Sequence, residues 1–161
     1  MKLLQTIPGV GARVAEVLAS EMGVDMTRFP TDSHLASWAG MCTGNNESAG
    51  KRLSGKTNKG STYLRDALVQ AAWAASHTKQ TYLAAQYRRM VRSKGQKRAL
   101  VAVGHSILVI AYHILKRRVG YRELGGDYFD RQHTEGIQRH LIRRLERLGL
   151  KVTVEPLAEA A

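Results

Sequence analysis

The sequence predicts an all-α fold that is interrupted by one long loop. Apolar residues make up 43% of the 161 residues and are mainly Ala, Leu and Val, whereas aromatic residues make up only 6%. This composition favours close-packed helices over a β-sandwich. In most segments the apolar residues recur at helical spacing, but residues 41–60 are rich in Gly, Asn and Lys and lack that spacing. We therefore expect a helical bundle, with one short strand at most in the C-terminal segment KVTVEP.

Three helices are predicted before the loop. They cover residues 2–7, 11–22 and 34–40, and they end at Pro8, Gly23 and Gly40. Pro cannot continue a helix, and Gly readily adopts the positive φ of a helix C-cap. Thr31 or Asp32 caps the third helix, because a short side-chain oxygen can accept from its free amides.

Four further helices are predicted after the loop, at residues 61–77, 80–94, 96–118 and 131–148. The apolar stretch 99–115 is short for a membrane span and is interrupted by polar residues, so we expect it to be a buried helix. We expect two parts packed as one unit. Residues 1–95 carry the N-terminal turn and the loop, and residues 96–161 form a helical extension.

Charge points to a polyanionic partner. Lys and Arg number 25 against 13 acidic residues, which gives a net charge of +12. Such a domain repels itself unless an anion is present, so nucleic acid is the first expected partner, ahead of a membrane surface or a ribosomal scaffold. The single cysteine, Cys42, excludes an internal disulfide and fits a reducing, cytoplasmic location. We expect no membrane association.

The segment Ile7-Pro8-Gly9-Val10-Gly11 resembles the hairpin of a helix-hairpin-helix DNA-binding motif. Two glycines allow a tight turn to approach a phosphate closely, and the amides at the start of the next helix can then bind the anion. The predicted backbone contacts are Gly9, Val10, Gly11 and Arg13. The alternative is an ordinary helical corner in which glycine serves geometry alone.

The long loop carries cations among small residues, a composition that suits contact with a nucleic-acid backbone. The predicted contacts are Lys51, Arg52, Lys56, Lys59 and Arg65. The spacing of Gly50, Gly55 and Lys56 fits a nucleotide-binding P-loop, but a P-loop follows a strand, and here a helix comes first.

Several blocks of the sequence occur in the order of one family. They include LLQTIPGVG, FPTDSHLASWAGMC, NNESAGKR, GKTNKGSTYLRDALVQAAW and YRELGGDYFDR. The chain resembles the C-terminal transposase domain of the insertion-sequence "one-ten" family, the Piv/MooV-type DNA recombinases that are guided by a bridge RNA.

The resemblance implies a division of labour between two halves of a transposase. A RuvC-like N-terminal half binds Mg²⁺ through acidic residues, and the C-terminal half supplies a serine that attacks a DNA phosphodiester. Ser48 matches the family serine, and Ser54 is the nearby competitor. Lys51 and Arg52 would stabilise charge on the phosphate. We expect no metal ligands in this chain, no RuvC-like half within it, and no activity in isolation. The implied partners are DNA, a guide RNA, the RuvC-like half and a second copy.

Other interpretations stay open. The chain could be a non-catalytic helix-hairpin-helix module that binds DNA or RNA. A basic run could contact nucleic acid or could equally be solvated helix ends; it comprises Arg88, Arg89, Arg92, Lys94, Lys97, Arg98, Lys116, Arg117, Arg118 and Arg122. The histidines have no metal-site spacing, and His105 and His113 are expected to be hydrogen-bonded core residues. We expect Asp127 and Asp130 to start a helix rather than to bind a metal with Glu123.

Overall fold

The computed structural model describes residues 1–42, 46–48, 51–54 and 57–155, with the backbone alone in 46–48 and 51–54. Within these residues the fold is helical, as predicted, apart from one short β-hairpin. The chain forms two compact units, Met1–Gly126 and Asp127–Ala161. The predicted boundary at residue 95 falls instead between two helices that pack against each other inside the first unit.

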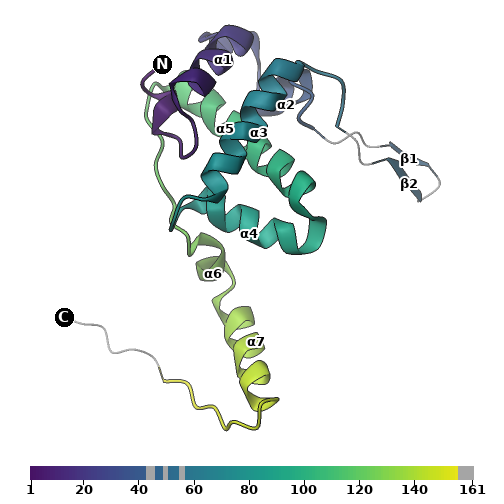
Figure 1. The fold of residues 1–161 in the computed structure, drawn as a ribbon, viewed down its shortest axis with the longest axis vertical. Coiled ribbons are helices and arrows are strands. Elements are labelled where there is room, and N and C mark those ends of the chain that lie inside the picture. The colour runs from purple at the N-terminus through teal and green to yellow at the C-terminus, as the bar shows by residue number, and fades with distance from the viewer. Residues whose placement is uncertain (43–45, 49–50, 55–56, 156–161) are drawn as a thin grey trace. The chain divides into compact units, whose positions relative to one another are not determined.

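The first unit is built around its longest helix, α5. In chain order its helical elements are the 3₁₀ turn η1 (Leu4–Thr6), α1 (Ala12–Met22), the 3₁₀ turn η2 (Met26–Arg28), α2 (Asp32–Trp38), α3 (Thr62–Ser76), α4 (Tyr82–Lys94) and α5 (Gln96–Arg117). α5 packs against α2, α3, α4 and both 3₁₀ turns, and α1 packs against α3. Figure 1 shows α5 crossing this unit beside α3 and α4.

The apolar stretch predicted as a buried helix forms the buried face of α5. Val103, Ile107, Leu108 and Tyr112 are at most 1% exposed. A Cβ on Gly104 would lie 3.3 Å from the backbone O of Leu68, so the absence of a side chain lets α5 approach α3 closely. By length and composition α5 is the one helix in the described residues that could cross a membrane, and half of its apolar window is buried inside the protein.

Side-chain caps fix where α2, α3 and α4 begin. Thr31 caps α2 by accepting from the His34 amide, which is one of the two predicted caps. Ser61 and Thr81 cap α3 and α4 in the same way. Each hydroxyl satisfies an amide that has no partner within its helix.

The segment after α5 ties distant parts of the first unit together. The Tyr121 amide donates to Thr6 Oγ1 at 2.8 Å. Glu123 Oε1 accepts from the Tyr82 amide at 2.7 Å and from the amides of Leu124 and Gly125 at 2.9 Å. Glu123 therefore stabilises the start of α4, and its Oε1 is occupied by three backbone amides.

The 41–60 segment, predicted as a loop without strands, contains an antiparallel hairpin. Strand β1 (Asn46–Ser48) pairs with β2 (Lys51–Ser54). The expectation of an irregular loop was wrong at these residues, because backbone pairing between two short strands does not require apolar side chains. Ser48 pairs with Lys51 and Glu47 with Arg52, and an irregularity between Asn46 and Glu47 then pairs Asn46 with Ser54.

The second unit contains α6 (Tyr128–Gln132) and α7 (Thr134–Glu146), where one helix over 131–148 was predicted. Asp127 is the N-cap residue of α6, which agrees with the predicted helix start, but its side chain makes no capping hydrogen bond and pairs with Arg131 Nε at 3.1 Å. No residue of α6 or α7 is buried. Residues 151–155 adopt no strand.

Candidate nucleic-acid interface

The N-terminal turn places Gly9 against α3. Gly9 has φ +85°, and a Cβ there would lie 2.3 Å from Ala71 O and 2.7 Å from Ala75 N. No side chain fits at that distance, so glycine is required here for packing between the turn and α3. Gly9 was predicted as a phosphate contact, but packing against α3 is enough to explain why this residue is a glycine.

Gly11 lies on the open side of the same turn. A Cβ on Gly11 would meet nothing within 4 Å. Gly11 is the N-cap residue of α1, where no side chain caps the helix, and Arg13 is exposed in the first turn. The start of α1 therefore presents free amides and one cation to open space, the arrangement that binds anions at helix N-termini.

Val10 differs from its neighbours in the predicted motif. Its side chain is 4% exposed, and its amide donates to Ile7 O at 3.0 Å. Val10 therefore belongs to the core and to the turn itself. The first helix of the predicted motif is a single 3₁₀ turn, η1, so only its second helix is a full α-helix.

The two ends of the 41–60 segment lie side by side in close contact. A Cβ on Gly60 would lie 2.4 Å from Ala39 O, and a Cβ on Gly40, which has φ +67°, would lie 2.7 Å from Asn58 O. The Asn58 amide donates to Cys42 O at 3.1 Å. Two glycines thus let the backbones touch where the segment leaves and rejoins the helices.

Arg65, on α3, binds both ends of the segment. Its Nη2 donates to Gly40 O at 3.1 Å and to Asn58 O at 2.8 Å. Arg65 was predicted to contact a phosphate, but its guanidinium donates to these two backbone carbonyls. We call Gly40, Gly60, Asn58 and Arg65 the loop clasp. Sequence reasoning missed it because the carbonyls that Arg65 contacts come from residues 7 and 25 positions away.

The remaining predicted residues fall on the hairpin and its flanks. Ser48 ends β1, Lys51 and Arg52 lie on β2, and Lys59 is exposed beside the clasp. Lys56 lies outside the described residues. Directly opposed residues of antiparallel strands share one face of the ribbon. The register therefore assigns positions 48 and 51 to one face and positions 47 and 52 to the other.

No cluster of three or more metal-ligating side chains occurs among the residues whose side chains the structure describes. Two of the acidic groups near helix ends already have partners: Glu123 caps α4, and Asp32 Oδ2 lies 3.3 Å from His113 Nε2. Burial raises the pKa of Asp32, but hydrogen bonds from the Ser33 amide and from His113 outweigh it, so its pKa lies below the ordinary value. The ten cations of the basic run from Arg88 to Arg122 are all exposed.

Comparisons with known proteins place the chain in a family. Residues 1–88 match the family model described as "Transposase IS116/IS110/IS902 family". The chain is similar to the "Insertion element IS110 uncharacterized 43.6 kDa protein" of Streptomyces coelicolor, with 30% identity over 116 residues. That match covers 71% of this chain and 28% of the relative, so the chain corresponds to less than a third of the relative's length. Because the family model covers more than half of its residues, the chain belongs to the IS116/IS110/IS902 family of transposases.

Proposed function

We propose that this chain holds the sugar–phosphate backbone of DNA and supplies Ser48 as the nucleophile for strand cleavage and exchange. The observation that carries the proposal is the hairpin register, which pairs Ser48 directly with Lys51. Attack on a phosphodiester requires a nucleophile and a positive charge near the phosphate. The register places a serine and a lysine on one face of the ribbon. The competitor Ser54 pairs with Asn46 and has no cation opposite it.

The proposed step is a transesterification. Ser48 Oγ loses its proton and forms a bond to phosphorus, while the bond from phosphorus to one bridging sugar oxygen breaks. That oxygen takes up a proton and leaves as a free hydroxyl. Lys51 would stabilise the negative charge that builds up on the non-bridging oxygens. A hydroxyl of another strand can then attack the same phosphorus and release Ser48, which completes the exchange.

Two further features support the proposal by positioning the strand. The open start of α1 at Gly11 offers amides to a neighbouring phosphate without reading sequence. The loop clasp holds the two ends of the segment that carries Ser48 against α3.

In this proposal the Mg²⁺ is bound by another part of the protein. The side chains that the structure describes contain no cluster of three or more metal ligands. A RuvC-like part of the same protein would hold Mg²⁺ and assist deprotonation of Ser48. A guide RNA and a second copy of the chain, acting in the bacterial cytoplasm, complete the proposed assembly.

The test is a search for a covalent protein–DNA adduct. The chain is combined with its RuvC-like part, guide RNA and an end-labelled cognate junction, and the products are separated under denaturing conditions. We expect a labelled adduct with the wild type and with Ser54→Ala, and none with Ser48→Ala. An adduct that survives Ser48→Ala contradicts the proposal. DNA binding by the wild type without any adduct would favour the non-catalytic binding module instead.

A further inference from the structure

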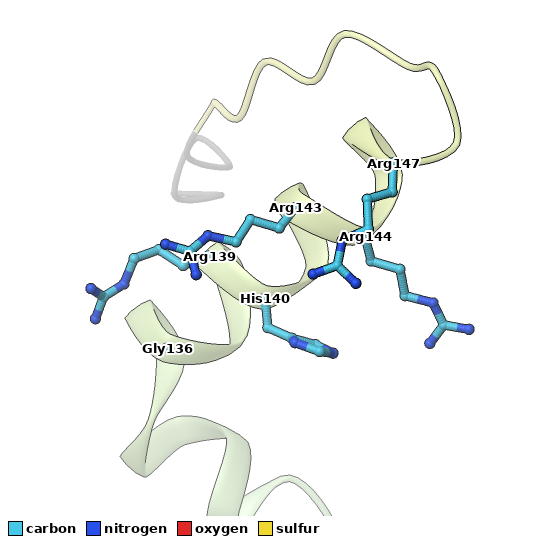
Figure 2. Close-up of a pocket in the computed structure, with 6 residues that line it drawn as sticks. All are labelled: Gly136, Arg139, His140, Arg143, Arg144 and Arg147. Carbon is cyan, nitrogen blue, oxygen red and sulfur yellow. The ribbon is translucent and has the colours of Figure 1, made fainter.

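One face of α7, continued by its C-cap residue, gathers five cationic or ring-nitrogen side chains without an acidic residue between them. It is formed by Arg139, His140, Arg143, Arg144 and Arg147, which together with Gly136 line a hollow of about 510 Å³. Figure 2 shows these side chains extending from the single helix. All five are exposed. We call this set the arginine face.

The charges of the arginine face are largely uncompensated inside the protein. Arg139 Nε donates weakly to Glu135 O at 3.4 Å, a carbonyl that carries no charge. In the described part of the chain, Arg143, Arg144 and Arg147 form no ion pair. At about 100° per residue, the two acidic residues of α7 fall beside this face rather than within it. Concentrated like charge of this kind is stabilised by a bound polyanion.

The spacing and the residue type both suit a phosphate backbone. Arg139, Arg143 and Arg147 follow one another at four-residue steps, which places their Cα atoms about 6 Å apart along the helix. A nucleic-acid strand offers phosphates as a regular row at comparable intervals. All the strong cations of this face are arginines, whose planar guanidinium groups bind phosphate oxygens in pairs.

The side of α7 opposite the arginines is apolar and carries Ile137, Leu141 and Leu145, followed by Leu148 just beyond its end. The three leucines are exposed. The sequence of α7 contains no Trp, Phe or Tyr, and Trp and Phe are common in helices that lie in a membrane interface. The chain belongs to a family of transposases, which favours nucleic acid over a membrane as the ligand of the arginine face.

We propose that the arginine face is a second binding site for a nucleic-acid backbone, separate from Ser48 and from the start of α1. Its ligand is the phosphodiester chain of a duplex, from DNA or from RNA. The site lies beyond the residues that the family model matches, and it does not depend on Ser48 being a nucleophile.

The test compares two variants of the whole chain that lose the same charge. The first changes Arg139, Arg143, Arg144 and Arg147 to Gln. The control changes Lys2, Arg28, Lys79 and Lys151 to Gln, which are exposed cations outside every proposed contact. Fluorescence anisotropy measures binding to a 24-base-pair DNA duplex and to an RNA duplex of the same sequence, over a range of salt concentrations.

We expect the arginine-face variant to bind at least one duplex about tenfold or more weakly than the control does. On DNA its log–log salt dependence should be shallower by about 0.9 for each phosphate contact that is lost. If the variant loses more affinity for one duplex than for the other, that difference identifies whether the site binds DNA or RNA. A third variant with Lys at the four arginine positions should bind more tightly than the Gln variant, since it keeps the charge.

Three results separate the possible outcomes. The proposal is overturned if the Gln variant binds each duplex as tightly as the control does. It is also overturned by a loss confined to vesicles that contain phosphatidylserine, which would identify a membrane contact. The serine assignment is tested by adduct formation and the arginine face by duplex binding, so failure of one is distinguishable from failure of the other. Far-UV circular dichroism checks that each variant retains its helices.

Discussion

The N-terminal turn and the loop clasp each contain a pair of glycines, and the two pairs differ in what surrounds them. In the turn, Gly9 is packed against α3 and Gly11 faces open space. In the clasp, Gly40 and Gly60 are both packed against backbone. A glycine required by neighbouring protein cannot be counted as evidence for a ligand. Of these four glycines, only Gly11 has open space where a side chain would lie, so only its lack of a side chain can serve a partner outside the chain.

The largest effect that tests this comparison is expected for Gly9→Ala. The substitution forces an L residue into φ +85° and puts a methyl group 2.3 Å from Ala71 O, so the turn must move away from α3. Backbone strain and overpacking together should cost about 3–5 kcal/mol of unfolding free energy. Urea denaturation measures it. Gly11→Ala is the control, and it should cost no more than about 1 kcal/mol, from the weaker N-cap. Equal losses in the two variants would contradict the distinction.

A smaller loss of stability is expected for Arg65→Met. The variant removes a charged donor from Gly40 O and Asn58 O and should cost about 1–3 kcal/mol. Thermal and urea denaturation measure the change. Lys59→Met is a matched control, because Lys59 is an exposed cation beside the same clasp. It should leave stability unchanged while weakening DNA binding. A fully stable Arg65→Met protein would show that the clasp does not depend on this side chain.

Much of the fold could be predicted because its signals are local. Apolar spacing predicted α1, α3, α4 and α5 to within a few residues, and Gly23 and Thr31 were identified as helix ends from their chemistry alone. The hairpin was missed because its strands are short and polar, so neither alternation nor β-branched residues signalled them. Likewise, no local pattern shows that an apolar run such as α5 will be the centre of the unit.

The candidate site was harder to predict than the fold, because its residues act through distant contacts. Arg65 has the sequence surroundings of a phosphate contact, yet its partners are carbonyls brought close by folding. Val10 lies between two glycines of a motif, yet its side chain is buried. The sequence predicted a helix over residues 131–148, but it did not identify the arginines of this helix as a binding site. These side chains line a hollow only in certain rotamers, and the sequence does not predict rotamers.

The next effect concerns binding rather than stability. Gly11→Val adds a branched side chain at the open start of α1, where the proposed phosphate approaches. The loss of one amide–phosphate contact should weaken binding of a DNA duplex about 5- to 30-fold. Gly11→Ala should lie between the wild type and Gly11→Val. Fluorescence anisotropy on protein of verified fold measures the series, and unchanged affinity in Gly11→Val would remove the turn from the proposed interface.

The smallest effect is expected at the ion pair between Asp32 and His113, which joins the start of α2 to α5. The pKa of Asp32 is lower in the folded protein than its ordinary value, so its carboxylate contributes stability above the ordinary pKa of an aspartate. That contribution is lost as the pH falls through the lower, folded-state pKa. Because both side chains are about a third or more exposed, Asp32→Asn should cost less than about 1 kcal/mol near neutral pH. The difference from the wild type should disappear in strong acid, as measured by urea denaturation at several pH values. A difference that stays constant down to the lowest pH would mean that the carboxylate charge contributes nothing and that Asp32 acts only through its shape.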